Sequence, residues 1–170
     1  MEFPMNEERF WQIIDTAWAS GSELKTFQDQ VLATLESSDA KEAFEELDVD
    51  APLLPDELTK NVRSQLDELS QDDLLAFDRI LERKLYDIDR EDVHEHTDGS
   101  DDGFLYCRGF IVAMGQRYYD AVNAEPSNAM FDWECEEINY ISCFLYEEKF
   151  GEMPRSEISR ETGTNPDGWS

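Results

Sequence analysis

Three charged residues in one short stretch could do chemistry together. Asp101 and Asp102 precede the apolar run GFLYCRGFIVA, in which Arg108 is the single cation. A guanidinium and a carboxylate can form a bidentate pair, and such a pair either braces a fold or holds an anionic ligand. Because an unpaired buried charge is very unfavourable, we expect Arg108 to meet a carboxylate of its own chain.

The acidic residues that could serve as this partner lie in two places. They stand at the start of the apolar run and in the later segment DWECEEINY, and they are Asp101, Asp102, Glu134, Glu136 and Glu137. A structural ion pair is the favoured interpretation, because ion-pair networks perturb charge without catalysing a reaction. The rival interpretation is an active or ligand-binding site built from the same acids and Arg108.

A second candidate for chemistry is the pair of histidines in REDVHEHTDGSDD. His94, His96 and Asp98 could hold a divalent cation through nitrogen and oxygen ligands. Alternate residues match no established spacing, and an EF-hand register that starts at His94 places Leu105 at the twelfth position, where a glutamate is needed. We therefore expect neither a metal nor another cofactor.

The three cysteines give no sign of reactivity. Cys107, Cys135 and Cys143 form no CxxC pair and lie in apolar patterns, which predicts buried, reduced thiols and a cytoplasmic location. Burial raises a thiol pKa, so these residues are poor nucleophiles. A serine nucleophile in a GxSxG turn is also missing from the sequence.

The charge of the chain restricts its partners. Among 170 residues, 41 are acidic and 14 are basic, which gives a formal net charge of -27. Most of the excess lies between residues 36 and 102. Such a field repels nucleic acid and anionic membranes, so we expect neither as a partner. The field either serves solubility alone or attracts a basic protein. The first residues lack the basic and apolar regions of a secretory signal, and the sequence has no apolar run long enough to span a membrane.

The spacing of apolar residues is helical along most of the chain. Asn6 and Ser70 are typical N-cap residues, and each is followed by acids in a first turn. A polar segment from Asp87 to Asp102 is expected to be a loop or a short exposed turn. The expected helices begin near residues 6, 22, 39, 56 and 70, with two further helices from about Asp102 to Val122 and from about Asp132 to Phe150.

The segment from Phe104 to Tyr119 is apolar on all sides, which predicts a helix at the centre of the domain. Gly109 and Gly115 would be unfavourable inside that helix unless a neighbour packs closely against them. After Pro154 the chain is polar. The sequence therefore predicts a mainly α, single-domain helical bundle over residues 1–154, with a tail over residues 155–170 that is extended or loosely docked.

Four segments of the chain carry a resemblance to a known family. They are MNEERFWQIID, ELSQDDLLAFDRIL, TDGSDDGFLYCRGFIVAMG and ECEEINYISCFLYEEKFGEMP. Together they resemble the bacterial domain-of-unknown-function family numbered 4240, which is also found attached to molybdate-metabolism-regulator-like proteins. The signature positions of the family correspond here to Asp101, Asp102, Gly103, Phe104, Tyr106 and Arg108.

The chain departs from the family pattern in three places. The family more often has an aromatic residue where Cys107 stands, a tryptophan near Gly109, and an apolar helix in place of DREDVHEHTDG. The resemblance implies a mainly helical domain and no particular reaction.

These observations favour a protein that acts by binding. The expected partner is a basic protein, and the expected role is that of an inhibitor, an immunity protein or a regulator. The alternative is a small enzyme or ligand-binding domain that uses the Asp/Arg/Glu residues named above, with a divalent metal near the histidines.

Overall fold

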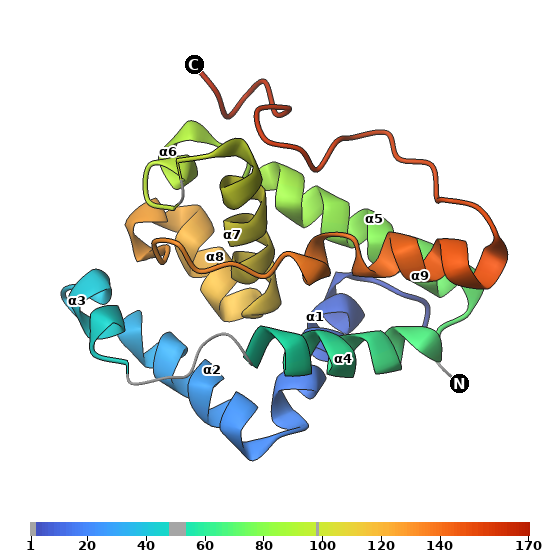
Figure 1. The fold of residues 1–170 in the computed structure, drawn as a ribbon, viewed down its shortest axis with the longest axis horizontal. Helices are drawn as coiled ribbons and strands as arrows, with labels where there is room; N and C mark the ends of the chain where they lie inside the picture. The colour runs from blue at the N-terminus through green and yellow to red at the C-terminus, as the bar shows by residue number, and fades with distance from the viewer. Residues whose placement is uncertain (1–2, 48–53, 98) are drawn as a thin grey trace.

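The protein is a bundle of α-helices, as the computed structural model shows (Figure 1). The structure describes residues 3–47, 54–97 and 99–170, and no strand occurs within these ranges. The predicted mainly α fold class is confirmed. The α-helices are α1 (Glu7–Ala19), α2 (Ser22–Thr34), α3 (Ala40–Glu45), α4 (Leu54–Asp67), α5 (Gln71–Asp87), α6 (Glu91–His94), α7 (Asp101–Ala113), α8 (Gln116–Ala124) and α9 (Ile141–Phe150), and two short 3₁₀ turns are η2 (Pro126–Asn128) and η3 (Glu137–Asn139).

The predicted N-caps of two helices are confirmed. The side chain of Asn6 accepts a 2.9 Å hydrogen bond from the amide of Arg9, at the start of α1. Ser70 accepts one of 3.2 Å from the amide of Asp73, at the start of α5. Each cap pairs one of the amides that the first turn of a helix leaves without a partner, so these polar residues fix where α1 and α5 begin.

The long helix predicted from Asp102 to Val122 is wrong in one respect, because it is two helices. The backbone turns at Gly115, between α7 and α8, with a φ of 98°. L-residues rarely adopt this conformation, and an added Cβ would also approach the Asp15 carboxylate to 2.9 Å. Gly115 therefore lies at a break between two helices and not inside one, and α1 packs closely against it as the sequence predicts.

The helix predicted from Asp132 to Phe150 is also shorter than expected. Residues 132–136 are not helical, and the amide of Cys135 instead donates a 3.1 Å hydrogen bond to the carbonyl oxygen of Tyr106 in α7. The apolar spacing persists because this segment packs on α7, although its backbone is irregular. The segment from Asp87 to Asp102 contains the short helix α6, where Val93 is buried.

The apolar helix α7 lies at the centre, as predicted. Ten of its residues are buried, from Gly103 to Ala113 with the exception of Tyr106. It contacts α5, α8 and η3, while α5 also packs against α9 and α1 packs against α4. The indole of Trp18 in α1 donates a 2.7 Å hydrogen bond to the carbonyl oxygen of Ala113, which joins α1 to the end of α7.

Gly109 allows the segment after residue 134 to lie directly on α7. A Cβ at this position would lie 2.5 Å from Asn139 Oδ1 and 2.6 Å from the carbonyl oxygen of Cys135. The close packing predicted at Gly109 is thus confirmed, because no side chain larger than hydrogen fits there without a shift of backbone.

The residues after Phe150 form no helix in the described chain, and they follow the surface of the bundle. Figure 1 shows this tail, in red, running back from the end of α9 past α5 toward α6. The amide of Glu91 in α6 donates a 2.8 Å hydrogen bond to the carbonyl oxygen of Gly168. In the part of the chain that the structure describes, no helix is both long and apolar enough to cross a membrane.

Candidate functional site

Arg108 is fully enclosed. Its side chain is 0% exposed, and the guanidinium lies 4.7 Å from the centre of the Phe104 ring. Nη1 donates a 2.8 Å hydrogen bond to the carbonyl oxygen of Leu85 in α5. Nη2 donates to the carbonyl oxygen of Arg160 at 2.9 Å and to Thr162 Oγ1 at 3.3 Å. The cation therefore joins three segments: α7, the end of α5 and the tail.

The hydrogen-bond acceptors of Arg108 differ from those the sequence predicts. They are two backbone carbonyls and a hydroxyl, whereas the predicted acceptors are the carboxylates of Asp101, Asp102, Glu134, Glu136 and Glu137. The reason is that the tail folds over the buried face of α7 and brings its own carbonyl oxygens there. Burial lowers the pKa of Arg108 to about 10, and the carboxylates of Asp89 and Glu161 act in the opposite direction.

A second buried arginine, Arg160, holds the tail from the other side. Its Nη2 donates a 2.6 Å hydrogen bond to Asp78 Oδ1 and lies 3.6 Å from Glu82 Oε2, while Nη1 bonds the carbonyl oxygen of Asn139 at 2.5 Å. Burial by itself would lower the pKa of Arg160, but Asp78 and Glu82 together raise it above its ordinary value. Ser142 Oγ also donates to Asp78, at 2.7 Å.

Sequence reasoning missed this network. The signal for it was present, because Asp78 and Glu82 are four residues apart on the same side of α5 as its apolar residues. Two carboxylates on an apolar helical face need a cation from elsewhere in the chain. The sequence could not identify that cation as Arg160, which lies in a segment without helical spacing.

Asp89, just after α5, is the third anchor of the tail. Its carboxylate is 0% exposed and accepts hydrogen bonds from the amides of Gly163 at 3.0 Å, Thr164 at 2.8 Å and Asn165 at 3.0 Å. It also accepts a 3.0 Å bond from the indole of Trp169. These contacts attach the final residues of the chain to the domain, so the tail is a strap with fixed contacts over α5 and α7.

Three of the five predicted acids, Asp102, Glu134 and Glu136, are exposed and lie near Tyr106. Partial desolvation of the Tyr106 phenol and the carboxylates of Glu136, Asp102 and Glu134 raise its pKa. Glu137 lies beside Glu136 along an adjacent groove. We call Asp102, Tyr106, Glu134, Glu136 and Glu137 the acidic face. Asp101 lies next to it, and its carbonyl oxygen accepts a 2.7 Å hydrogen bond from Thr162 Oγ1.

The groove beside the acidic face has an apolar floor. It encloses about 440 Å³ between α4 and α9. The rings of Tyr140 and Phe144 stack along it with centroids 5.5 Å apart, and Phe144 is 55% exposed. Tyr140 donates a 2.7 Å hydrogen bond to Glu161 Oε1, and burial together with this carboxylate raises the pKa of the phenol to about 12. The groove thus offers aromatic surface within reach of carboxylates.

The histidines considered as metal ligands lie in different environments. His94 packs edge-on against Phe104, with ring centroids 5.0 Å apart, and 5.4 Å from Trp169. His96 lies on the wall of a separate cavity. Asp98 is outside the described residues. Among the residues that the structure describes, no group of three His, Cys, Asp or Glu side chains is placed to hold a metal ion.

The three thiols are buried, as predicted, and none forms a disulfide. Burial raises the pKa of Cys135 to about 12 and also raises the pKa of Cys143. A thiol with a raised pKa carries little thiolate at neutral pH, so Cys135 and Cys143 are unreactive packing residues.

The chain was compared with protein families, curated proteins and solved structures. No curated protein and no solved structure matches the chain significantly. One family model, described as "Protein of unknown function (DUF4240)", matches residues 44–148. The match includes α7 with Arg108, the acidic face and the acids of α5, but it ends before the strap. Because the matched region covers more than half of the sequence, the chain belongs to the DUF4240 family.

Proposed function

We propose that this protein acts by binding a basic protein through the acidic face and the adjacent groove. The observation that carries the proposal is the gathering of Asp102, Glu134 and Glu136 around Tyr106, on a molecule whose net charge is -27. Like charges repel one another, so a surface that gathers them is favoured when an oppositely charged partner neutralises them.

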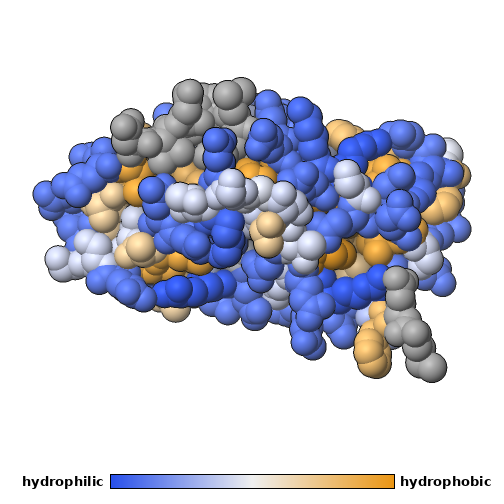
Figure 2. All heavy atoms as spheres, turned by 90° about the horizontal axis from the view of Figure 1, so that it is seen from below, coloured by the Kyte–Doolittle hydropathy of each residue, from blue (hydrophilic) through white to orange (hydrophobic). Residues whose placement is uncertain are grey.

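The ion pairs that the basic residues form within the molecule support the proposal. Most of the 14 basic side chains are engaged within the molecule, and Arg108 is buried. The ion pairs of the described residues involve Arg9, Lys25, Arg63, Arg83, Lys84, Arg90, Arg117, Lys149 and Arg160. Two cations, Lys60 and Arg63, line the groove itself, and Arg63 is paired there with Glu148. The surface is correspondingly hydrophilic, and Figure 2 shows one face with only small, scattered apolar patches.

The groove adds apolar contacts to the electrostatic attraction. Rim charges mainly accelerate association, whereas affinity comes from a few anchors in well-packed pockets. Phe144 and Tyr140 present aromatic surface beside Glu136 and Glu137. The partner that fits is a basic segment with an apolar or aromatic anchor residue.

The specific role of the protein stays a prediction: an inhibitor, an immunity protein or a regulator. Its location in a bacterial cytoplasm and its likeness to molybdate-metabolism-regulator-like proteins are predictions as well. Buried thiols without disulfides are compatible with that compartment. The rival, a small enzyme or ligand-binding domain centred on Arg108, has less support because Arg108 is fully buried beneath the strap.

The test uses a defined probe, a 12-residue peptide that alternates lysine or arginine with leucine and contains one phenylalanine. Its affinity is measured by calorimetry at several salt concentrations. One variant neutralises the acidic face, and a control variant changes the net charge equally at exposed sites elsewhere. The acidic-face variant carries Asp102→Asn, Glu134→Gln, Glu136→Gln and Glu137→Gln, and the control carries Glu23→Gln, Glu42→Gln, Glu46→Gln and Asp120→Asn.

We expect the acidic-face variant to bind the peptide at least about tenfold more weakly and the control to change affinity by less than about threefold. Affinity of the unmodified protein should fall steeply as salt rises, because salt screens the exposed charges. Equal losses in the two variants would contradict the proposal, since the peptide would then respond only to net charge.

A further inference from the structure

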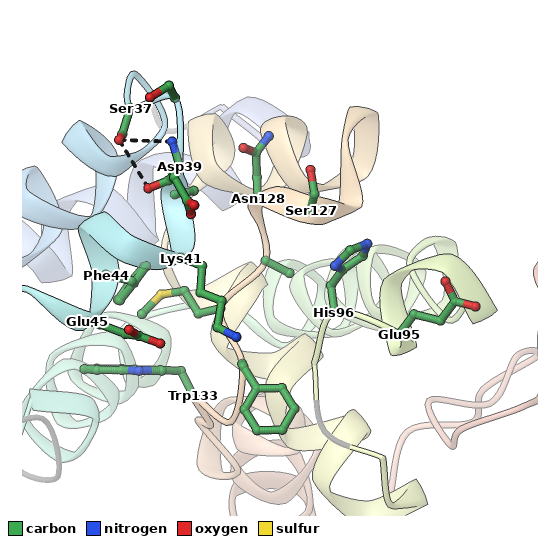
Figure 3. Close-up of a pocket in the computed structure, with 15 residues that line it drawn as sticks. Ser37, Asp39, Lys41, Phe44, Glu45, Glu95, His96, Ser127, Asn128 and Trp133 are labelled. Atoms are coloured by element: carbon green, nitrogen blue, oxygen red, sulfur yellow. Dashed lines mark hydrogen bonds between the residues drawn. The ribbon is translucent and has the colours of Figure 1, made fainter.

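A second cavity lies away from the acidic face. It encloses about 650 Å³ between α3, the residues just after α6, and the segment around η2 (Figure 3). A cavity of this size holds a small molecule or one long side chain with its neighbours. None of the residues of the acidic face or its groove lines it.

One part of the cavity wall is aromatic. Trp133 and Phe44 line it with ring centroids 5.6 Å apart, and Phe131 lines it while remaining 65% exposed. Trp133 also packs against two further aromatic rings, because its ring centroid lies 5.6 Å from that of Phe27 and 5.7 Å from that of Phe110. Aromatic faces attract cations, and tryptophan does so most strongly.

The charges of the wall favour the same kind of ligand. Three carboxylates, those of Asp39, Glu45 and Glu95, line the cavity, against one permanent cation, Lys41. In Figure 3 the Lys41 ammonium points into the middle of the cavity, between Trp133 and His96. Lys41 is exposed and makes no ion pair within the described residues, so no salt bridge holds its side chain in place.

We propose that this cavity binds an organic cation, an ammonium or guanidinium group on an aliphatic stem, against the Trp133 side of its wall. The ligand cation contacts Trp133 and is neutralised by Glu45. Lys41 then competes with the ligand, and because it is exposed on a flexible stem it can move aside at little cost. The source is a free amine or a lysine or arginine side chain of a protein, and only the second source depends on the proposed function.

The test follows the indole N–H signal of Trp133 by NMR during titration with agmatine, which carries both a guanidinium and an aliphatic stem. Trp133→Phe assigns the signal. We expect a saturable shift, at least about fivefold tighter binding in Lys41→Met, and at least about fivefold weaker binding in Glu45→Gln. Arg155→Met, at an exposed arginine of the strap, makes the net charge equally more negative and should change the affinity by less than about twofold.

Further arms separate the alternatives. A peptide with one arginine between small residues should bind more tightly than agmatine if the source is a protein side chain, and equally well if it is a free amine. The acidic-face variant should leave agmatine affinity unchanged, so failure here is distinct from failure of the proposed function. The proposal is overturned by the absence of a saturable shift, by weaker binding in Lys41→Met, by no loss in Glu45→Gln, or by benzoate binding that Lys41→Met abolishes.

Discussion

Arg160, in the strap, donates a 2.6 Å hydrogen bond to Asp78 in the middle of α5, and both side chains are buried. This contact joins two residues 82 positions apart in the sequence. Arg160 lies outside the region that matches the DUF4240 family, whereas Asp78 lies inside it. The strap therefore provides the cation that pairs with the buried carboxylates of α5, although the strap itself is not helical.

Replacement of Arg160 should destabilise the fold strongly. In Arg160→Met the buried carboxylates of Asp78 and Glu82 lose their cation, and breaking a buried pair in this way typically costs about 3–5 kcal/mol. Urea unfolding monitored by circular dichroism measures the change. Arg155→Gln, at an exposed arginine of the same segment, is the control. A loss below about 1 kcal/mol in Arg160→Met would contradict the importance of this network.

Replacement of Arg108 should lower stability through its acceptors. Arg108→Met leaves the carbonyl oxygens of Leu85 and Arg160 without their donor, at about 1–3 kcal/mol for each buried group. Arg108→Lys should recover less than half of the loss, because one ammonium cannot reproduce the planar fork that reaches both carbonyls. Urea unfolding of both variants tests this. A stable Arg108→Met protein would instead support a role for Arg108 in binding.

Loss of Asp89 should free the end of the strap while the helices stay folded. In Asp89→Ala the amides of Gly163, Thr164 and Asn165 lose their acceptor. Their hydrogen exchange should accelerate by about 100-fold, because local opening then no longer breaks charge-assisted hydrogen bonds. Asp167→Ala, at an exposed acid of the strap, is the control. Unchanged exchange at residues 163–165 in Asp89→Ala would show that Asp89 does not hold the strap.

The contribution of Asp73 to stability should depend on pH. The amide of Met5, at 2.8 Å, and the Arg9 guanidinium, at 3.0 Å, both donate to its carboxylate and lower its pKa from the ordinary value of 3.8. A carboxylate with a lowered folded pKa stabilises the fold above its unfolded pKa, and this stability is lost as the pH falls through the folded pKa.

The matching experiment compares Asp73→Asn with the unmodified protein by urea unfolding at two pH values. We expect Asp73→Asn to be about 1 kcal/mol less stable at about pH 7 and equal in stability near pH 2. Asp72→Asn, at an exposed neighbour, should differ little at either pH. An equal difference for Asp73→Asn at both pH values would show that its carboxylate charge does not stabilise the fold.

Local sequence patterns were sufficient to predict where most helices begin and which helix is central. Asn6 and Ser70 cap their helices through contacts within a few residues, and such contacts are encoded locally. The spacing of apolar residues wrongly predicted one helix across Gly115, because apolar residues continue past this glycine while the backbone turns there. A pattern of side chains does not report a change of φ at a single glycine.

The site was harder to predict because its contacts are distant in the sequence. The enclosure of Arg108 follows from its apolar neighbours, but its acceptors are backbone carbonyls of Leu85 and Arg160, and any residue type can provide a carbonyl. Three of the five predicted acids, Asp102, Glu134 and Glu136, lie near Tyr106 and not at Arg108. Arg108 bonds to carbonyl oxygens and not to these acids because the strap folds over α7, and the sequence pattern does not report where the strap lies.

The central claim is that the acidic face binds the basic partner while the two buried arginines brace the fold. Amide chemical-shift mapping of the isotope-labelled protein with the basic peptide described above tests it most directly. We predict saturable shifts concentrated at Tyr106, Glu136, Tyr140 and Phe144, with the signals of α2 and α8 largely unchanged. Shifts spread evenly over every exposed acid, or confined to a different part of the surface, would contradict the claim.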